Sequence, residues 1–291
     1  YVAGGASIPI DGSDVEPEDG HDIITTLDVT IQDVAERALE KMMIENECTY
    51  GTCIVMEVKT GKIKAMANLG RQKDGTYWED FNYATTPSEP GSTFKLATMI
   101  SVLEDNLATI NTPINLEGGK WNIAGETVYD AEFHGLYQTN LQHAFEHSSN
   151  VGMAKLAYYS YNSQPSKFLQ HLHKLKMDTL TGIDLPDEKR PTVYTPRSKY
   201  WSNTTLPWMG FGYSLMVSPL QTLTLYNAIA NGGKMMRPYL VNAIVKDGHV
   251  IKKVDPAVIN DHICNASTLK QLYECLEGVV LNGTAQKIKT N

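Results

Sequence analysis

Hydrophobic and polar positions in the first part of the chain predict a helix followed by a β-hairpin. Residues 23–27 form a short β-rich run, and Asp28 follows it as a candidate helix cap. Apolar residues then recur at the spacing of an amphipathic helix. These positions are Ile31, Val34, Ala38, Leu39 and Met42. Strand-like runs at 53–56 and 63–66 flank Lys59–Lys62, so this segment is expected to be a hairpin turn.

Helical patterns dominate the middle of the chain, and strands return near its end. A polar loop over residues 70–91 ends in Pro90-Gly91 and leads into a predicted helix at 92–104. Residues 178–206 are loop-rich. Further helices are predicted at 141–146, 151–156, 220–230 and 267–280, and further strands at 240–245 and 250–254. Strands, a large helical insert and more strands favour a mixed α/β (α+β) domain with segregated helices.

The two ends of the sequence suggest a piece of a longer protein. Residues 1–22 are rich in Gly, Asp and Pro and are expected to be the end of a preceding module or a linker. Residues 23–291 are expected to form the main domain. Neither terminus reads as a natural chain end, so we expect a fragment that is truncated at its C-terminus.

Composition and charge narrow the function classes. The 291 residues carry a formal net charge of -8, a pI near 5.5 and no basic stripe, which argues against a nucleic-acid partner. No apolar run approaches the roughly 18 residues that span a bilayer, so a membrane anchor is expected outside this chain. No glycine-rich phosphate loop follows a strand, and no cofactor is expected.

Cysteine and histidine spacing predicts no metal site. The cysteines form no Cys-x-x-Cys pair and are expected to be buried apolar residues, with their disulfide status left open. They are Cys48, Cys53, Cys264 and Cys275. His171 and His173 fall in a polar helical stretch and are expected at the surface.

Ser92 and Lys95 are the first candidates for chemistry. Residues three apart on a helix lie on one face, so Lys95 can reach the Ser92 hydroxyl. A serine needs a base to become a nucleophile, and a lysine is that base only when its pKa is lowered. A second Ser-x-x-Lys, Ser267–Lys270, is interpreted as an ordinary helix cap with an exposed lysine.

Ser148-Ser149-Asn150 is the second candidate element. Ser148 and Asn150 are two residues apart and can face one cleft from a short turn between helices. Ser148 can relay a proton between Lys95 and a leaving amine, and Asn150 can orient Lys95 and accept a substrate N–H. A similar run, Ser160-Tyr161-Asn162, precedes Pro165 and is interpreted as a helix end.

These motifs, in this order, resemble those of penicillin-binding proteins and serine β-lactamases, which continue with a Lys-Thr-Gly on a strand. The only literal Lys-Thr-Gly, Lys59-Thr60-Gly61, precedes the nucleophile and is interpreted as a structural turn. Longer runs resemble the transpeptidase domain of class B penicillin-binding proteins. They are Thr26–Asp28 with Ile31-Gln32, Val55–Met66, Glu89–Lys95, Phe145–Gly152, and Ala228–Gly233 with Arg237-Pro238.

The resemblance implies a penicillin-binding protein/serine β-lactamase-like fold, with an antiparallel sheet flanked by helices and an all-helical subdomain. Leu206–Tyr213 is more similar to the division (septal) type than to the elongation type. Glu277–Val280 and Gly283–Ala285 resemble the stretch shortly before the third motif. We therefore expect the closing C-terminal strands to lie beyond Asn291.

The resemblance implies peptidoglycan DD-transpeptidation through an acyl-enzyme at Ser92, with Lys95, Ser148 and Asn150 as the other catalytic residues. The implied partners are peptidoglycan stem peptides, β-lactam antibiotics, the division machinery and a glycosyltransferase. The implied location is the outer side of the bacterial inner membrane. A serine β-lactamase or β-lactam sensor, and a catalytically incomplete scaffold of the division complex, remain alternatives. Tyr129, Asp130 and His134 are candidate cleft residues, although loop residues here are more often structural.

Overall fold

The computed structural model describes residues 2–3, 6–7, 20–131 and 137–289. They form helices and antiparallel sheets, which confirms the predicted mixed α/β class. The chain divides into two compact units, one made of residues 1–25 and 241–255 and the other of residues 26–240 and 256–291. The predicted domain boundary at residue 22 stays a prediction.

The smaller unit is built on a three-stranded antiparallel sheet in the order β15-β14-β3. Its strands are β3 (Asp22–Thr25), β14 (Val241–Lys246) and β15 (His249–Lys253). Lys246 pairs with His249, so Asp247-Gly248 forms the predicted hairpin turn between β14 and β15. Short strands β1 (Val2–Ala3) and β2 (Ala6–Ser7) pair with each other.

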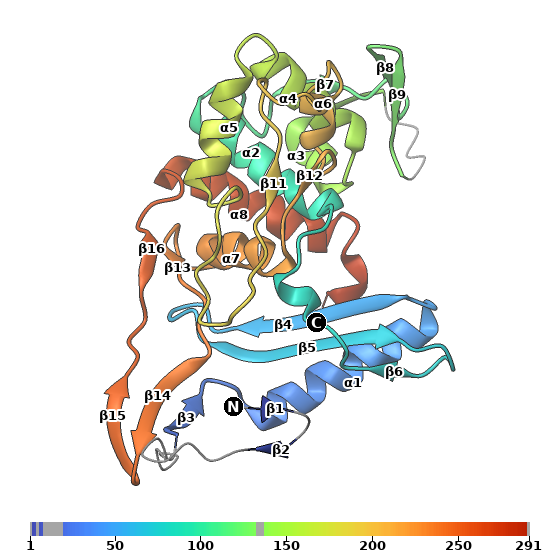
Figure 1. The fold of residues 1–291 in the computed structure, drawn as a ribbon. Helices are drawn as coiled ribbons and strands as arrows, with labels where there is room; N and C mark the ends of the chain where they lie inside the picture. Colours follow the sequence, from blue (N-terminus) through green and yellow to red (C-terminus); the bar gives the residue numbers. More distant parts are fainter. Residues whose placement is uncertain (1, 4–5, 8–19, 132–136, 290–291) are drawn as a thin grey trace. The chain divides into compact units, whose positions relative to one another are not determined.

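The larger unit contains the sheet β4-β5-β6, made of Tyr50–Met56, Ile63–Arg71 and Tyr77–Trp78. Helix α1 (Val29–Glu45) contacts β4 and β5 on one side of this sheet, and α7 (Pro219–Ala230) contacts β4 on the other (Figure 1). Asp28 caps α1 by accepting the backbone N–H groups of Thr30 and Ile31, as predicted. The predicted β4–β5 hairpin is also confirmed.

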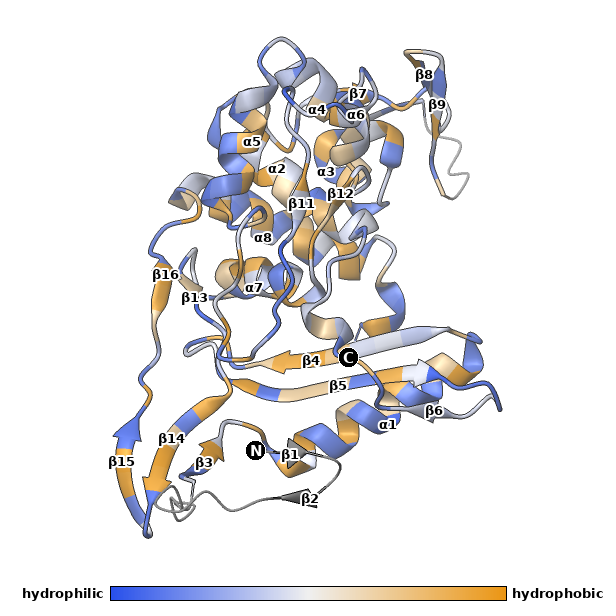
Figure 2. Cartoon of the chain, viewed as in Figure 1, coloured by the Kyte–Doolittle hydropathy of each residue, from blue (hydrophilic) through white to orange (hydrophobic). Residues whose placement is uncertain are grey.

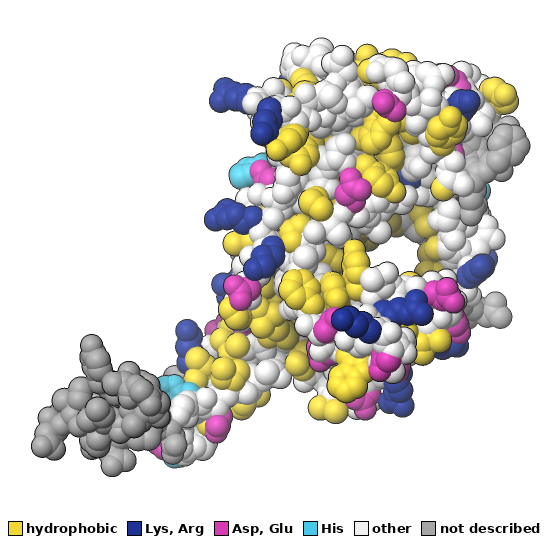
Figure 3. Space-filling model, turned by 45° about the vertical axis from the view of Figure 1, so that its right-hand side comes forward, with side chains coloured by type: hydrophobic (Ala, Val, Ile, Leu, Met, Phe, Trp, Pro, Cys, Tyr) yellow, Lys and Arg dark blue, Asp and Glu magenta, His cyan; other side chains and the backbone are white. Residues whose placement is uncertain are grey.

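The face that α1 buries differs from the predicted one. Ala35 and Met43 are its buried residues, whereas Val34 and Met42 are 60% and 54% exposed. The contact with the sheet is a narrow stripe at i, i+4 spacing, which leaves the neighbouring apolar positions in solvent. Hydrophobic side chains accordingly reach the surface in several places (Figure 3).

Among the residues that the structure describes, the larger unit contains seven α-helices in addition to α1. They are α2 (Lys95–Glu104), α3 (Leu141–Glu146), α4 (Asn150–Tyr161), α5 (Pro165–Lys174), α6 (Thr205–Met209), α7 and α8 (Ala266–Leu281). Helix α2 contacts α4, α5 and α8, and every residue from Lys95 to Leu103 is buried. Figure 2 shows hydrophobic residues along β5 and on the helices around α2. The first residue of α2 is therefore held by a rigid core.

Several short strands were not predicted. They are β6, β7 (Pro113–Asn115), β8 (Lys120–Ile123), β9 (Glu126–Tyr129), β10 (Gln138–Asn140), β11 (Thr192–Val193), β12 (Leu215–Met216), β13 (Met235–Met236) and β16 (Val258–Asn260). The predicted loop at 70–91 therefore contains β6 and a 3-10 turn at Tyr83–Thr85. Strands of two to four residues are too short to show a hydrophobic period.

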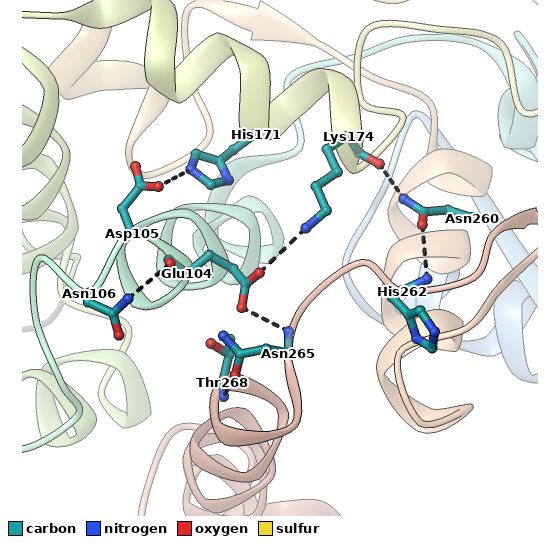
Figure 4. Close-up of polar contacts among 9 residues, drawn as sticks. All are labelled: Glu104, Asp105, Asn106, His171, Lys174, Asn260, His262, Asn265 and Thr268. Carbon is teal, nitrogen blue, oxygen red and sulfur yellow. Dashed lines mark hydrogen bonds and ion pairs between the residues drawn. The ribbon is translucent and has the colours of Figure 1, made fainter.

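The far end of α2 is fixed by a polar cluster (Figure 4). The Glu104 carboxylate accepts the backbone N–H of Asn265 at 2.9 Å and pairs with Lys174 at 3.4 Å. His171 lies 2.9 Å from Asp105 and is half-buried, with 16% of its side chain exposed, whereas His173 is exposed, as predicted. These contacts join the end of α2 to α5 and to the start of α8.

Cys264 and Cys275 are buried as predicted, whereas Cys48 and Cys53 are half-buried, and the four are free thiols. Burial raises the pKa of Cys275 to about 12, which keeps it protonated. Across the described residues, no helix is both long and apolar enough to cross a membrane.

Candidate active site

Ser92 lies on a 3-10 turn, η2 (Gly91–Phe94), directly before α2. The predicted helix at 92–104 is therefore an α-helix only from Lys95, because the first turn is wound more tightly. Ser92 is exposed, whereas Lys95 is 1% exposed. The turn thus presents the serine to solvent and leads the lysine directly into the core.

The turn that carries Ser92 is held by backbone contacts with a distant segment. Gly91 has a φ of +56° and donates its N–H to the carbonyl of Gly212 at 3.0 Å. Ser88 pairs with Val217 just before the turn. The Tyr226 hydroxyl donates to the carbonyl of Thr93 at 3.0 Å. Gly212 belongs to the run Leu206–Tyr213, which resembles the division type. This run therefore helps to hold the turn that carries Ser92.

The Lys95 amine lies at the centre of the candidate site. Its Nζ is 3.0 Å from Ser92 Oγ and 2.9 Å from Ser148 Oγ. It is also 2.5 Å from the carbonyl oxygen of Ser148 and 2.8 Å from Asn150 Oδ1. The structure thus brings together all four predicted catalytic residues: Ser92, Lys95, Ser148 and Asn150.

The number of hydrogens on Lys95 limits how these contacts are shared. An ammonium has three N–H donors and a neutral amine has two, with one lone pair. The Ser148 carbonyl and Asn150 Oδ1 can only accept, so they take two N–H groups. Only the hydroxyls of Ser92 and Ser148 can donate to the lone pair of the neutral amine. The geometry therefore directs that lone pair at a serine proton.

Burial lowers the pKa of Lys95 from its ordinary value to about 8, because removal from water disfavours the ammonium. The negative charge of Asp130 acts in the opposite direction and raises it. A pKa near neutrality gives a useful fraction of neutral amine while the group remains a strong base.

Ser148 reaches Lys95 through an unusual backbone conformation. Its φ is +54°, in the left-handed region, directly after the end of α3. Its N–H donates to the carbonyl of Phe145 at 2.9 Å. A left-handed residue is a common way to end a helix, and a non-glycine residue carries some strain in this conformation. Here it aims the hydroxyl and the carbonyl of one residue at the same amine.

Asn150 is oriented by its amide nitrogen. Nδ2 donates to the carbonyl of Tyr129 at 2.9 Å, which leaves Oδ1 facing Lys95. Ser149, between the two predicted site residues, is fully buried and caps α4 by accepting the N–H of Gly152. Its hydroxyl donates to the carboxylate of Asp130.

The three other sequence runs with similar motifs lie outside the candidate site. Ser267 is inside α8 and the cap is Asn265, so its interpretation as a cap residue is wrong. Lys59-Thr60-Gly61 forms the β4–β5 turn, where Gly61 has a φ of +81°, as predicted. Ser160-Tyr161-Asn162 ends α4, also as predicted.

The sequence did not indicate the structural role of Ser149, because one buried residue in a three-residue turn produces no hydrophobic period. Of the candidate cleft residues, Tyr129 contacts Asn150 and Asp130 contacts Ser149. His134 lies outside the described residues. Thr290 and Asn291, at the end of the chain, are also outside them. Within the described ranges, no group of three or more His, Cys, Asp or Glu side chains is arranged to hold a metal ion.

The chain belongs to the penicillin-binding protein transpeptidase family, because residues 51–290 match the family described as "Penicillin binding protein transpeptidase domain". The predicted family is thereby confirmed. The fold supports this: a penicillin-binding protein 3 from Mycobacterium tuberculosis, complexed with aztreonam, superposes with a TM-score of 0.76 at 27% identity. That match covers 90% of this chain and 58% of the other.

Curated relatives are longer than this chain. Penicillin-binding protein PbpB from Mycobacterium tuberculosis is 29% identical over 90% of this chain and 38% of its own length. Peptidoglycan D,D-transpeptidase FtsI from Escherichia coli is 27% identical over 94% of this chain and 44% of its own length. The chain thus spans less than half the length of these relatives.

Proposed function

We propose that this chain is the catalytic domain of a peptidoglycan DD-transpeptidase that forms an acyl-enzyme at Ser92. One observation carries the proposal: the buried Lys95 amine contacts an exposed serine hydroxyl, a second hydroxyl and a fixed amide oxygen. Similarity to proteins named peptidoglycan D,D-transpeptidase supports the choice of reaction and substrate.

Acylation begins with neutral Lys95, whose lone pair takes the proton of Ser92. The Ser92 oxygen attacks the carbonyl carbon of the penultimate D-Ala in a stem peptide ending in D-Ala-D-Ala. The proton on Lys95 passes through the Ser148 hydroxyl, 2.9 Å away, to the departing D-Ala nitrogen. The C–N bond breaks, free D-Ala leaves, and an ester on Ser92 remains.

Deacylation runs the same proton path in reverse. An amine of a neighbouring stem peptide attacks the ester, and its proton returns by way of Ser148 and Lys95 to the Ser92 oxygen. The new amide bond is the cross-link. Asn150 keeps Lys95 in place through Oδ1, since its Nδ2 is held by the Tyr129 carbonyl. A β-lactam amide acylates Ser92 in the same way but leaves no amine product to depart.

We also propose the division (septal) type, supported by the resemblance of Leu206–Tyr213. The proposed location is the outer side of the bacterial inner membrane, where peptidoglycan is assembled. The proposed partners are division proteins and a glycosyltransferase. Residues 23–291 would form the transpeptidase domain, and residues 1–22 the link to a preceding module.

Labelling with a fluorescent penicillin tests the proposal on the full-length protein. The wild-type protein is expected to retain the label through denaturing electrophoresis, and Ser92→Ala to lose it. Ser267→Ala is the matched control, because Ser267 heads the second Ser-x-x-Lys on the solvent-exposed start of α8. Label that survives Ser92→Ala contradicts the assignment.

The same reagent separates the alternatives. A serine β-lactamase would release the label within seconds to minutes, whereas a transpeptidase or a β-lactam sensor retains it. A catalytically incomplete scaffold would take no label in the wild-type protein. The presence of Lys95 in contact with Ser92 favours the transpeptidase over the scaffold.

A further inference from the structure

Asp130 connects the hairpin β8–β9 to the turn that carries Ser148 and Asn150. It directly follows β9, and its backbone N–H donates to the Gly119 carbonyl at 2.9 Å. Its carboxylate accepts the Val151 N–H at 2.8 Å and the Ser149 hydroxyl at 2.9 and 3.0 Å. A carboxylate thus occupies the start of α4, where free N–H groups favour negative charge.

The buried Ser149 hydroxyl makes this connection specific. It is 0% exposed, donates to Asp130 and accepts the Gly152 N–H at 2.9 Å. The preceding residue of the hairpin, Tyr129, holds Asn150 Nδ2. Tyr129 and Asp130 therefore fix the Ser149–Val151 segment. Through this segment they position Ser148 and Asn150, which contact Lys95.

Asp130 also acts on Lys95 by its charge. The other described side chains around the amine, those of Ser92, Ser148 and Asn150, are neutral. Asp130 raises the Lys95 pKa against the lowering by burial. When Lys95 takes the Ser92 proton, a positive charge develops on a buried amine, and the Asp130 carboxylate stabilises it.

Other titratable groups lie on the elements packed around this carboxylate. On β8, the Lys120 amine lies over the ring of Tyr129, 5.4 Å from its centroid. On α4, the buried Lys155 pairs with Glu117. At the C-cap of α3, His147 immediately precedes Ser148. Among these groups, Asp130 is the one whose charge raises the Lys95 pKa.

We propose that Asp130 is a positioning residue for proton transfer, which holds the Ser149–Val151 segment and stabilises the charge that forms on Lys95. The inference rests on the proposed function of Ser92 and Lys95. Asp130 itself exchanges no proton: the Ser92 O–H bond breaks and an N–H bond forms on Lys95.

The test measures the rate of Ser92 acylation by a fluorescent penicillin against pH in the full-length protein. Asp130→Asn keeps the size of the side chain and removes its charge. We expect the acylation rate on the plateau above the lysine pKa to be about tenfold or more below wild type, as for loss of a preorganised electrostatic contact. We also expect the midpoint of the pH profile to move to lower pH, because the lysine loses the charge that raised its pKa.

Further variants separate charge from structure. Ser149→Ala should lower the rate without moving the midpoint, and Asp130→Glu should lie between wild type and Asp130→Asn. Asp74→Asn, in an exposed turn, is the matched control and should behave as wild type. Thermal unfolding of each variant confirms that it is folded.

An unmoved midpoint in folded Asp130→Asn overturns the proposal, even if the rate falls. If Asp130→Asn does not fold, Asp130→Glu decides: a slower rate with a shifted midpoint supports the proposal, and wild-type values for both overturn it. If wild-type protein is not acylated at Ser92, the proposed function fails, and that result is distinct from any behaviour of the Asp130 variants.

Discussion

A β-carbon at position 212 would lie 1.9 Å from the carbonyl oxygen of Gly91, so only glycine allows these two backbones to meet beside Ser92. Gly212 also has a φ of +94°, where other residues are strained. Gly212→Ala must therefore displace the nucleophile turn. We expect a loss of about 1–3 kcal/mol in the free energy of unfolding and a markedly slower acylation rate.

Gly75→Ala is the control for Gly212→Ala. Gly75 has a similar φ of +88°, but a β-carbon there would meet no atom within 4 Å. It should cost stability without slowing acylation. Urea unfolding and penicillin labelling of both variants measure the two effects. Equal acylation rates in the two variants would show that the Gly91–Gly212 contact does not support Ser92.

The acylation rate should depend on pH through Lys95. Its pKa is lowered to about 8 by burial, and only the neutral amine accepts the Ser92 proton. The rate should therefore rise by about tenfold per pH unit below the pKa and level off above it. Lys95→Arg, which cannot deprotonate, should remove this rise together with the activity. A rate that stays constant between about pH 6 and 9 would exclude Lys95 as the base.

Lys95 should reduce stability at neutral pH. Its folded-state pKa of about 8 is below the ordinary value of 10.5, so the unfolded chain binds more protons between these values. Stability due to this group therefore rises as pH increases from about 8 to 10.5 and is at its lowest below that range. Lys95→Met should raise the Tm at pH 7 and abolish acylation.

The stability effect of Lys95 is measured by unfolding wild type and Lys95→Met at several pH values. The difference between them should change by up to about 3 kcal/mol from neutral to alkaline pH, in favour of wild type. Leu96→Met, at the next buried position, is a control whose difference from wild type should not vary with pH. A pH-independent difference for Lys95→Met would mean that burial does not lower the lysine pKa.

Glu104 should stabilise the end of α2 that lies opposite Lys95. Its side chain is 12% exposed, accepts the Asn265 N–H at the start of α8 and pairs with Lys174. Glu104→Gln should cost about 1 kcal/mol, because it removes a charge from a helix N-terminus and an ion pair. Glu45→Gln is the control, since its pair with Lys41 at 3.8 Å is exposed and should contribute little. Equal Tm values for the two variants would contradict this account.

The hydrophobic pattern predicted the long helices and the two main hairpins, because each has a cap, a turn or an uninterrupted period. Asp28 before α1 and Asp247-Gly248 between β14 and β15 are examples. The buried face of α1 was misplaced, since Val34 and Ala35 are both apolar and only the sheet decides which is covered. Short strands such as β8 and β9 depend on pairing with each other and show no period.

The candidate site was predicted as a set of residues but not as a geometry. Ser-x-x-Lys spacing occurs at both Ser92 and Ser267, and only the fold places one of them beside Ser148. The left-handed Ser148 and the role of Ser149 depend on contacts between residues that are distant in sequence. Neither has a signal that a single sequence can show.

Peptide mapping by mass spectrometry is the most direct test of the central claim that Ser92 is the acylated nucleophile. The full-length protein is incubated with a penicillin, digested, and searched for the added mass. We expect the addition on the peptide containing Ser92, and its loss in Ser92→Ala and in Lys95→Met. An addition on the peptide containing Ser148 or Ser267, with Ser92 unmodified, would contradict the account.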